Sequence, residues 1–128
     1  MKIHTGYYAK QAKYESSGLL PISISRGVPK WASPKVLMKD LAPSWDMLNL
    51  SESEYTIRFA KILENQDPHS LYNELKSMAD AHGCSGVVLM CYEKPDDFCH
   101  RHLVADWMNS NGYNVTEFET NATSKFFK

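Results

Sequence analysis

Apolar and polar residues follow two different periods along the chain, and the shorter period predicts where the strands lie. Residues 2–9 (KIHTGYYA) and 19–27 (LLPISISRG) alternate β-branched or aromatic residues with small or polar ones, which is typical of strands. Residues 85–92 (SGVVLMCY) form a continuous apolar run, which favours a strand buried on both faces of a parallel sheet. Residues 113–118 (YNVTEF) are predicted to form the last strand.

The longer period predicts two helices in the middle of the chain. Residues 51–66 and 67–83 repeat their apolar side chains at helical spacing. The first segment opens with Ser51 and Glu54 at the spacing of a capping box. The second opens on Asp67 as an N-cap, with a proline in the next position and a glycine at its end.

A third helix is predicted over residues 98–112, between the apolar strand and the last strand. This order is that of a βαβ unit, whose crossover is right-handed by default. The chain is therefore predicted to be one three-layer α/β domain over residues 1–128, Rossmann-like, with a mainly parallel sheet of four or five strands. Residues 119–128 are predicted to form a tail.

The segment 28–50 is irregular. Its prolines break any long helix, and it contains Trp31 and Trp45. A connection of this length is either a functional lid or an unrecognised element. Its tryptophans are suited to covering the core or to packing over a ligand. If exposed, they would also offer a face for a homodimer.

Composition and charge narrow the classes of partner. The chain has 128 residues and a formal net charge of −1, so no broad basic field favours nucleic acid. No apolar run approaches the roughly 18 residues of a membrane span, so no membrane partner is expected. The first ten residues lack the apolar core of a signal peptide. The chain has three cysteines, an odd number. Together with the lack of a signal-peptide pattern, this number predicts a cytoplasmic protein with reduced thiols.

The richest chemistry lies in residues 90–102 (MCYEKPDDFCHRH), between the apolar strand and the third helix. Such a strand-to-helix loop lies at the carboxyl edge of the sheet, where open α/β sheets bind ligands. The unpaired amides at the helix start favour an anion, and Arg101 offers a planar fork of donors for phosphate or carboxylate. Arg26, at the end of the second strand, is expected at the same edge, as is Tyr7. Alternatively, an aspartate caps the helix and Arg101 pairs with a surface carboxylate.

Catalytic and metal chemistry are further interpretations of this stretch. Cys99, near the helix start, is the candidate for a reactive thiol, whereas Cys91 ends a buried strand and is expected to be inert. With His100 and His102 these cysteines also form a candidate zinc set, but their spacing matches no standard pattern. Neighbouring residues of a helix also point about 100° apart, so no metal is expected.

A carboxylate completes this candidate site. Glu93 follows the apolar strand, where a base or nucleophile would lie. It is equally suited to an ion pair that orients Arg101. His100 is the candidate proton donor.

The segment VVLMCYEKPDDFCHRHLVADWM resembles the Domain of Unknown Function 488 family, in which a strand ending in Cys-x-Glu is followed by a turn and a helix opening with Cys-His-Arg. The matching positions are Cys91, Glu93, Cys99, His100, Arg101, Leu103, Val104 and Ala105. PISISRGVPKW resembles the family's second strand, with Arg26 at the family's arginine and a serine where an aspartate is common. The resemblance implies a cytosolic α/β domain with these residues clustered, and it supplies no settled activity.

Together, these patterns predict that the chain binds, and as an extension processes, a small anionic ligand that resembles phosphate or a nucleotide. The alternatives are a module that sequesters the ligand without catalysis and a Cys/His metal or thiol-redox protein. The sequence identifies no cofactor. The expected catalytic residues are Glu93, His100 and Cys99. The expected ligand contacts are Arg26, Arg101, Cys91, Tyr7 and Trp31.

Overall fold

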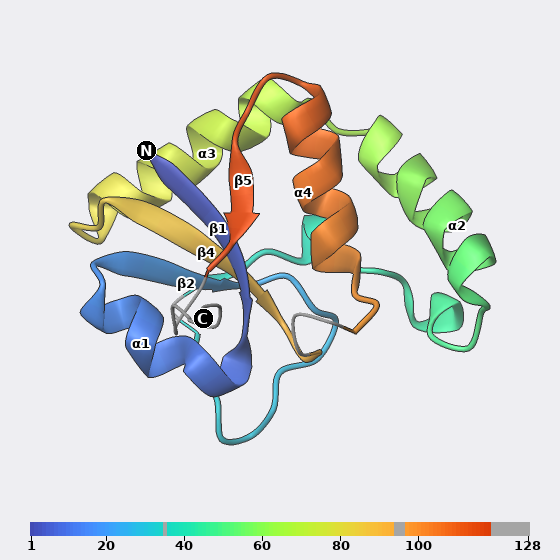
Figure 1. The fold of residues 1–128 in the computed structure, drawn as a ribbon, viewed down its shortest axis with the longest axis horizontal. Helices are drawn as coiled ribbons and strands as arrows, with labels where there is room; N and C mark the ends of the chain where they lie inside the picture. The colour runs from blue at the N-terminus through green and yellow to red at the C-terminus, as the bar shows by residue number, and fades with distance from the viewer. Residues whose placement is uncertain (35, 94–96, 119–128) are drawn as a thin grey trace, which may run out of the picture.

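A five-stranded parallel sheet forms the centre of the protein (Figure 1). The computed structural model describes residues 1–34, 36–93 and 97–118. The strands are β1 (Lys2–Tyr7), β2 (Leu19–Ser23), β3 (Val36–Leu37), β4 (Gly86–Cys91) and β5 (Val115–Glu117). They lie in the order β3-β2-β4-β1-β5, and every pairing is parallel. The predicted α/β class with a parallel sheet is confirmed.

Helices cover both faces of this sheet. The α-helices are α1 (Gln11–Ser16), α2 (Glu52–Glu64), α3 (Pro68–Ala81) and α4 (His100–Ser110). Short 3-10 turns occupy Tyr8–Lys10, Lys39–Leu41 and Trp45–Met47. One apolar cluster joins the sheet to α2, α3 and α4, and a smaller one joins it to α1, so the fold has three layers (Figure 1).

Strand β4 shows why its sequence is apolar throughout. All six of its residues are buried, because β1 and β2 flank it and helices cover both of its faces. Val87 and Leu89 belong to the cluster under α2, α3 and α4, whereas Val88 and Met90 belong to the cluster under α1. The alternation of a strand therefore delivers Cys91 to the same face as α4.

The predicted caps of α2 and α3 are confirmed. The Ser51 side chain accepts a hydrogen bond from the backbone N–H of Glu54, over 3.3 Å. The Asp67 carboxylate accepts one from the N–H of Ser70, over 3.1 Å. These bonds satisfy amides that a helix start leaves unpaired. Both helices end one turn or less before their predicted bounds.

We expect Asp67→Ala to lower the free energy of unfolding by about 1 kcal/mol, because it removes an N-cap acceptor. Urea denaturation at neutral pH measures this loss. Asp67→Asn is the matched control, since asparagine caps about as well as aspartate. Equal losses in the two variants would contradict the role of the cap.

Several elements differ from the prediction. Helix α1 and the two-residue strand β3 were missed because each is too short to show a period. Strand β2 ends at Ser23, four residues earlier than predicted. Helix α4 begins at His100 with Cys99 as its N-cap, rather than at residue 98 with an aspartate cap. Asp96, which with Asp97 was one of the two candidate caps of this helix, lies outside the described residues, as does the predicted tail at 119–128.

Among the residues that the structure describes, no helix is both long enough and apolar enough to cross a bilayer.

Candidate functional site

A cavity of about 390 Å³ opens where β2, β4 and α4 meet. Residues that follow β2, the end of β4 and the start of α4 line one side, and the segment around the Trp45–Met47 turn lines the other. The strand ends concerned are carboxyl ends, so the cavity lies at the edge predicted from the βαβ pattern. Its aromatic walls are Trp45, Tyr55, Tyr92 and Phe98.

Arg26 supplies the positive charge of the cavity wall. Its Nε donates a hydrogen bond to the carbonyl oxygen of Pro43 over 3.0 Å, which orients the guanidinium. In the described part of the chain no ion pair involves Arg26. The terminal guanidinium nitrogens are therefore available to an incoming anion.

Hydrogen bonds between buried hydroxyl groups fix the loop that carries Arg26. The Tyr8 hydroxyl bonds to Ser23 over 2.6 Å and also to Ser25, whose own hydroxyl donates to the carbonyl of Gly27. Burial raises the pKa of Tyr8 above its ordinary value, so the phenol stays protonated. Because Ser25 and Gly27 flank Arg26, this network fixes the backbone on both sides of the arginine.

Two carboxylates also line the cavity. Glu93 follows β4, and Glu52 opens α2. Both residues are exposed, so water and salt screen their charges. Their carboxylate oxygens can accept hydrogen bonds from hydroxyl groups at the rim of the cavity.

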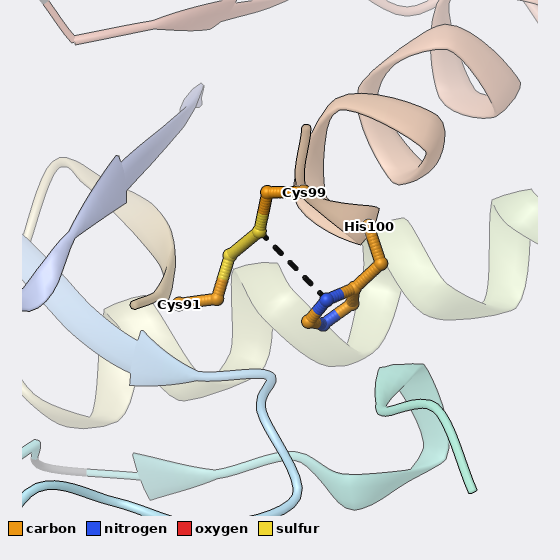
Figure 2. A group of neighbouring side chains, drawn as sticks. All are labelled: Cys91, Cys99 and His100. Carbon is orange, nitrogen blue, oxygen red and sulfur yellow. Dashed lines mark hydrogen bonds between the residues drawn. A yellow bond between two sulfur atoms is a disulfide. The ribbon is translucent and has the colours of Figure 1, made fainter. Parts of the chain in front are cut away.

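Cys91 and Cys99 are joined in a disulfide in the cavity wall (Figure 2). The prediction of reduced thiols is therefore wrong for this pair and confirmed only for Cys84. The turn between β4 and α4 brings the two sulfurs together although eight positions separate them in sequence. In the disulfide, Cys99 has no thiolate, so the predicted nucleophile is present only after reduction.

His100 is buried, and its ring lies beside the disulfide (Figure 2). Burial lowers its pKa from 6.5 to about 4. Its Nε2 lies 2.6 Å from the carbonyl oxygen of Ile24, which can only accept, so Nε2 carries the proton. The lone pair is then on Nδ1, 3.8 Å from the Cys99 sulfur. In this tautomer Nδ1 is an acceptor and Nε2 is engaged by Ile24, and the catalytic role of His100 as a proton donor stays a prediction.

The sulfurs of Cys91 and Cys99 and an imidazole nitrogen of His100 lie within 4.8 Å of one another. Cysteine and histidine are zinc ligands, so the reduced form of this set fits a soft metal ion. In the oxidised form shown here the sulfurs are bonded to each other and hold no ligating thiolate. His102 is not part of the group.

Arg101 does not line the cavity, and its side chain is fully buried. Its Nε and Nη2 donate to the Glu117 carboxylate over 3.0 and 2.9 Å, and its Nη1 donates to the Cys91 sulfur over 3.2 Å. The prediction that Glu93 orients Arg101 is wrong, because the bidentate partner is Glu117 on β5. Thr5 on β1 also donates to that carboxylate, over 2.6 Å.

The remaining predicted contacts fall outside the cavity lining. The Arg101 guanidinium carbon lies 6.0 Å from the centre of the Tyr7 ring, which places Tyr7 beside the buried ion pair. Trp31 is 68% exposed and does not line the cavity, whereas Trp45 does. The structure thus brings together Arg26, Cys91, Glu93, Cys99 and His100.

Comparison with known protein families produced a match. A family model described as the Active DUF488-N3 subclade matches residues 7–112. That range includes every residue that lines the cavity, whereas Glu117 lies beyond it. Neither the curated proteins nor the solved structures contain a significant match.

Proposed function

This chain belongs to the DUF488 family, within its Active DUF488-N3 subclade, and we propose that it binds a small anionic, nucleotide-like ligand in the cavity at the carboxyl edge of the sheet. The observation that carries the proposal is Arg26: an oriented guanidinium in an aromatic-walled cavity, without an ion-pair partner among the described residues. A guanidinium in that state favours phosphate or carboxylate, which it can bind with two parallel hydrogen bonds.

The walls suit the rest of a nucleotide. A cavity of about 390 Å³ falls in the usual range for small-molecule sites, about 300–1,000 Å³. Trp45, Tyr92 and Phe98 offer ring faces and edges against which a planar base can pack. The ligand's phosphate would then bind Arg26 at the same wall.

The two rim carboxylates are consistent with this ligand. An acidic side chain that accepts hydrogen bonds from ribose hydroxyl groups is a recurrent feature of dinucleotide sites in α/β folds. Glu52 and Glu93 line the cavity where they can play this part. A ligand that carried phosphate alone would leave both carboxylates without a role, so we favour a sugar-containing anion.

Two groups are placed for chemistry on such a ligand. Glu93 is the candidate base or nucleophile, since its carboxylate is exposed at the cavity rim. His100 can accept a proton at Nδ1 while Nε2 stays bonded to Ile24. Turnover of the bound nucleotide, followed by chromatography, separates an enzyme of this kind from a module that only sequesters its ligand.

We expect Arg26→Ala to weaken binding by about 10- to 100-fold, because a hydrogen bond to a charged group contributes about 1.5–3 kcal/mol. Nucleoside mono-, di- and triphosphates are screened by thermal shift, and hits are measured by isothermal titration calorimetry. Arg58→Ala is the control, since Arg58 is a surface arginine paired with Asp46 outside the cavity. The proposal fails if no nucleotide stabilises the native protein, or if Arg26→Ala binds the hit as well as Arg58→Ala does.

A further inference from the structure

The disulfide borders the cavity of the candidate site. Cys91 ends β4, Cys99 caps α4, and both line the cavity. Exchange requires that an incoming thiolate has access to a sulfur. Both cysteines line the cavity, although Cys91 is 1% and Cys99 3% exposed, so a thiol has to enter the cavity to reach them. Neither the family match nor the binding of an anion at Arg26 gives this pair a role.

The two sulfurs have different surroundings. The Cys91 sulfur accepts a hydrogen bond from Nη1 of the buried Arg101, over 3.2 Å. The Cys99 sulfur instead faces Nδ1 of His100, 3.8 Å away. Because that nitrogen carries a lone pair, it can accept a hydrogen bond from a Cys99 thiol, but the neutral ring donates no hydrogen bond from Nδ1 to a Cys99 thiolate.

These surroundings favour a thiolate at Cys91 over one at Cys99. The Glu117 carboxylate binds Nε and Nη2 of Arg101 and compensates part of its charge. Nη1 nevertheless donates its hydrogen bond to the Cys91 sulfur. At the start of α4 the Cys99 side chain makes no capping hydrogen bond to the helix amides, so its sulfur has the helix dipole but no direct donor such as the one that Cys91 receives from Arg101. In exchange, the sulfur whose thiolate is better stabilised leaves faster.

We propose that the Cys91–Cys99 pair carries out thiol–disulfide exchange with a low-molecular-weight thiol that enters the cavity, with attack on Cys99 and departure of Cys91. This activity does not depend on the binding of a nucleotide. It uses the sulfurs of Cys91 and Cys99, which the proposed binding at Arg26 does not need.

The electrons and protons balance over two steps. A thiolate attacks the Cys99 sulfur, forms a mixed disulfide and releases Cys91 as a thiolate beside Arg101. A second thiol, as its thiolate, attacks the small-molecule sulfur of that mixed disulfide and releases Cys99, which takes up a proton and donates to Nδ1 of His100. Two thiols are oxidised to one disulfide, and the protein disulfide is reduced by two electrons.

The test traps the first step in a Cys84→Ser background, in which Cys91 and Cys99 are the two remaining cysteines. Cys84 precedes the amino end of β4, far along the strand from the cavity, so its removal leaves the site intact. Oxidised protein is mixed with reduced glutathione and quenched with acid and then with N-ethylmaleimide. Peptide mapping by mass spectrometry then locates the glutathione and the maleimide. A urea-unfolded sample of the same protein is the control.

We expect glutathione on Cys99 and maleimide on Cys91, with a preference on the order of tenfold or more in the folded protein and little preference in urea. In glutathione buffers of graded ratio, the folded protein should pass reversibly between disulfide and dithiol. Glutathione found mainly on Cys91, or a disulfide that stays intact in reduced glutathione, would overturn the proposal. So would a reduced protein that retains about one zinc ion per chain and then resists oxidation by glutathione disulfide.

Discussion

Replacing Glu117 with leucine is expected to reduce the stability of the protein by about 3–5 kcal/mol, the usual loss when one partner of a buried ion pair is removed. Glu117 receives two hydrogen bonds from Arg101, whose side chain is fully buried, whereas the Glu117 side chain is 20% exposed. Without the carboxylate, the guanidinium keeps its charge in the core and loses its strongest acceptor. For a chain of this length, the melting temperature should fall by roughly 10–20 °C.

Urea denaturation of native protein and variant measures this loss. Lys76→Ala is the control, because Lys76 and Asp80 form an exposed ion pair, for which we expect a loss of less than about 1 kcal/mol. A double variant, Arg101→Met with Glu117→Leu, should recover much of the stability because no unpaired charge remains. A Glu117→Leu protein as stable as the Lys76→Ala protein would show that Arg101 does not depend on this carboxylate.

Acid is expected to destabilise the protein through His100. The pKa of His100 is about 4 in the folded state and 6.5 in the reference state, so between these values the unfolded chain binds more protons. The contribution of His100 is therefore fully present above pH 6.5 and is lost as the pH falls toward 4. The difference in pKa corresponds to about 3 kcal/mol, and below pH 4 the loss levels off because the folded protein also binds the proton.

The measurement is the free energy of unfolding at a series of pH values from 7.5 down to about 3.5, for native protein and His100→Gln. A glutamine amide can replace the hydrogen bond from Nε2 to Ile24 but does not titrate in this range. Carboxylates titrate in both proteins, so their contributions cancel in the difference between the two free energies of unfolding. His82→Gln, at the exposed end of α3, is the second control. If the curves of native protein and His100→Gln run parallel, the burial of a neutral His100 does not govern acid stability.

The sequence predicted well those elements that are long or that begin with a recognisable cap. The α2 and α3 helices run for 13 and 14 residues with side-chain caps at their first turns, so local information sufficed. Strand β4 was predicted from its apolar run, because burial on both faces leaves no polar positions. Helix α1 has only six residues and packs mainly through Tyr14, so it carries too few apolar positions to show a helical period.

The site was predicted in outline, and its errors come from contacts between distant segments. Arg26, Glu93 and His100 reach one cavity because carboxyl ends of parallel strands share an edge. Glu117 was missed because its partnership depends on β5 lying next to β1, with Glu117 paired in register with Thr5. No local pattern around residue 117 reveals that neighbour. The only signal was an acidic residue in a strand otherwise typical of a sheet interior.

The disulfide was missed for a related reason. Cysteines at 91 and 99 with a turn between them are compatible with separate thiols, a metal site or a bridge. The choice depends on how closely the start of α4 approaches the end of β4, and packing sets that distance. The number of cysteines in a chain predicts only whether its thiols are reduced on average. Whether Cys91 and Cys99 form a bond depends on the distance between their backbone segments.

The position of β1 between β4 and β5 bears on how the chain folds during synthesis. Strand β1 ends at Tyr7, whereas its two neighbours in the sheet begin at residues 86 and 115 and are therefore synthesised later. Its edges therefore stay unpaired while most of the remaining chain is made, and parallel pairing over such separations is slow. Unpaired strand edges are also the usual starting points of aggregation. Strand β1 can thus be paired on both edges only after β4 and β5 have been made, and Glu117 on β5 helps to hold it through its bond to Thr5.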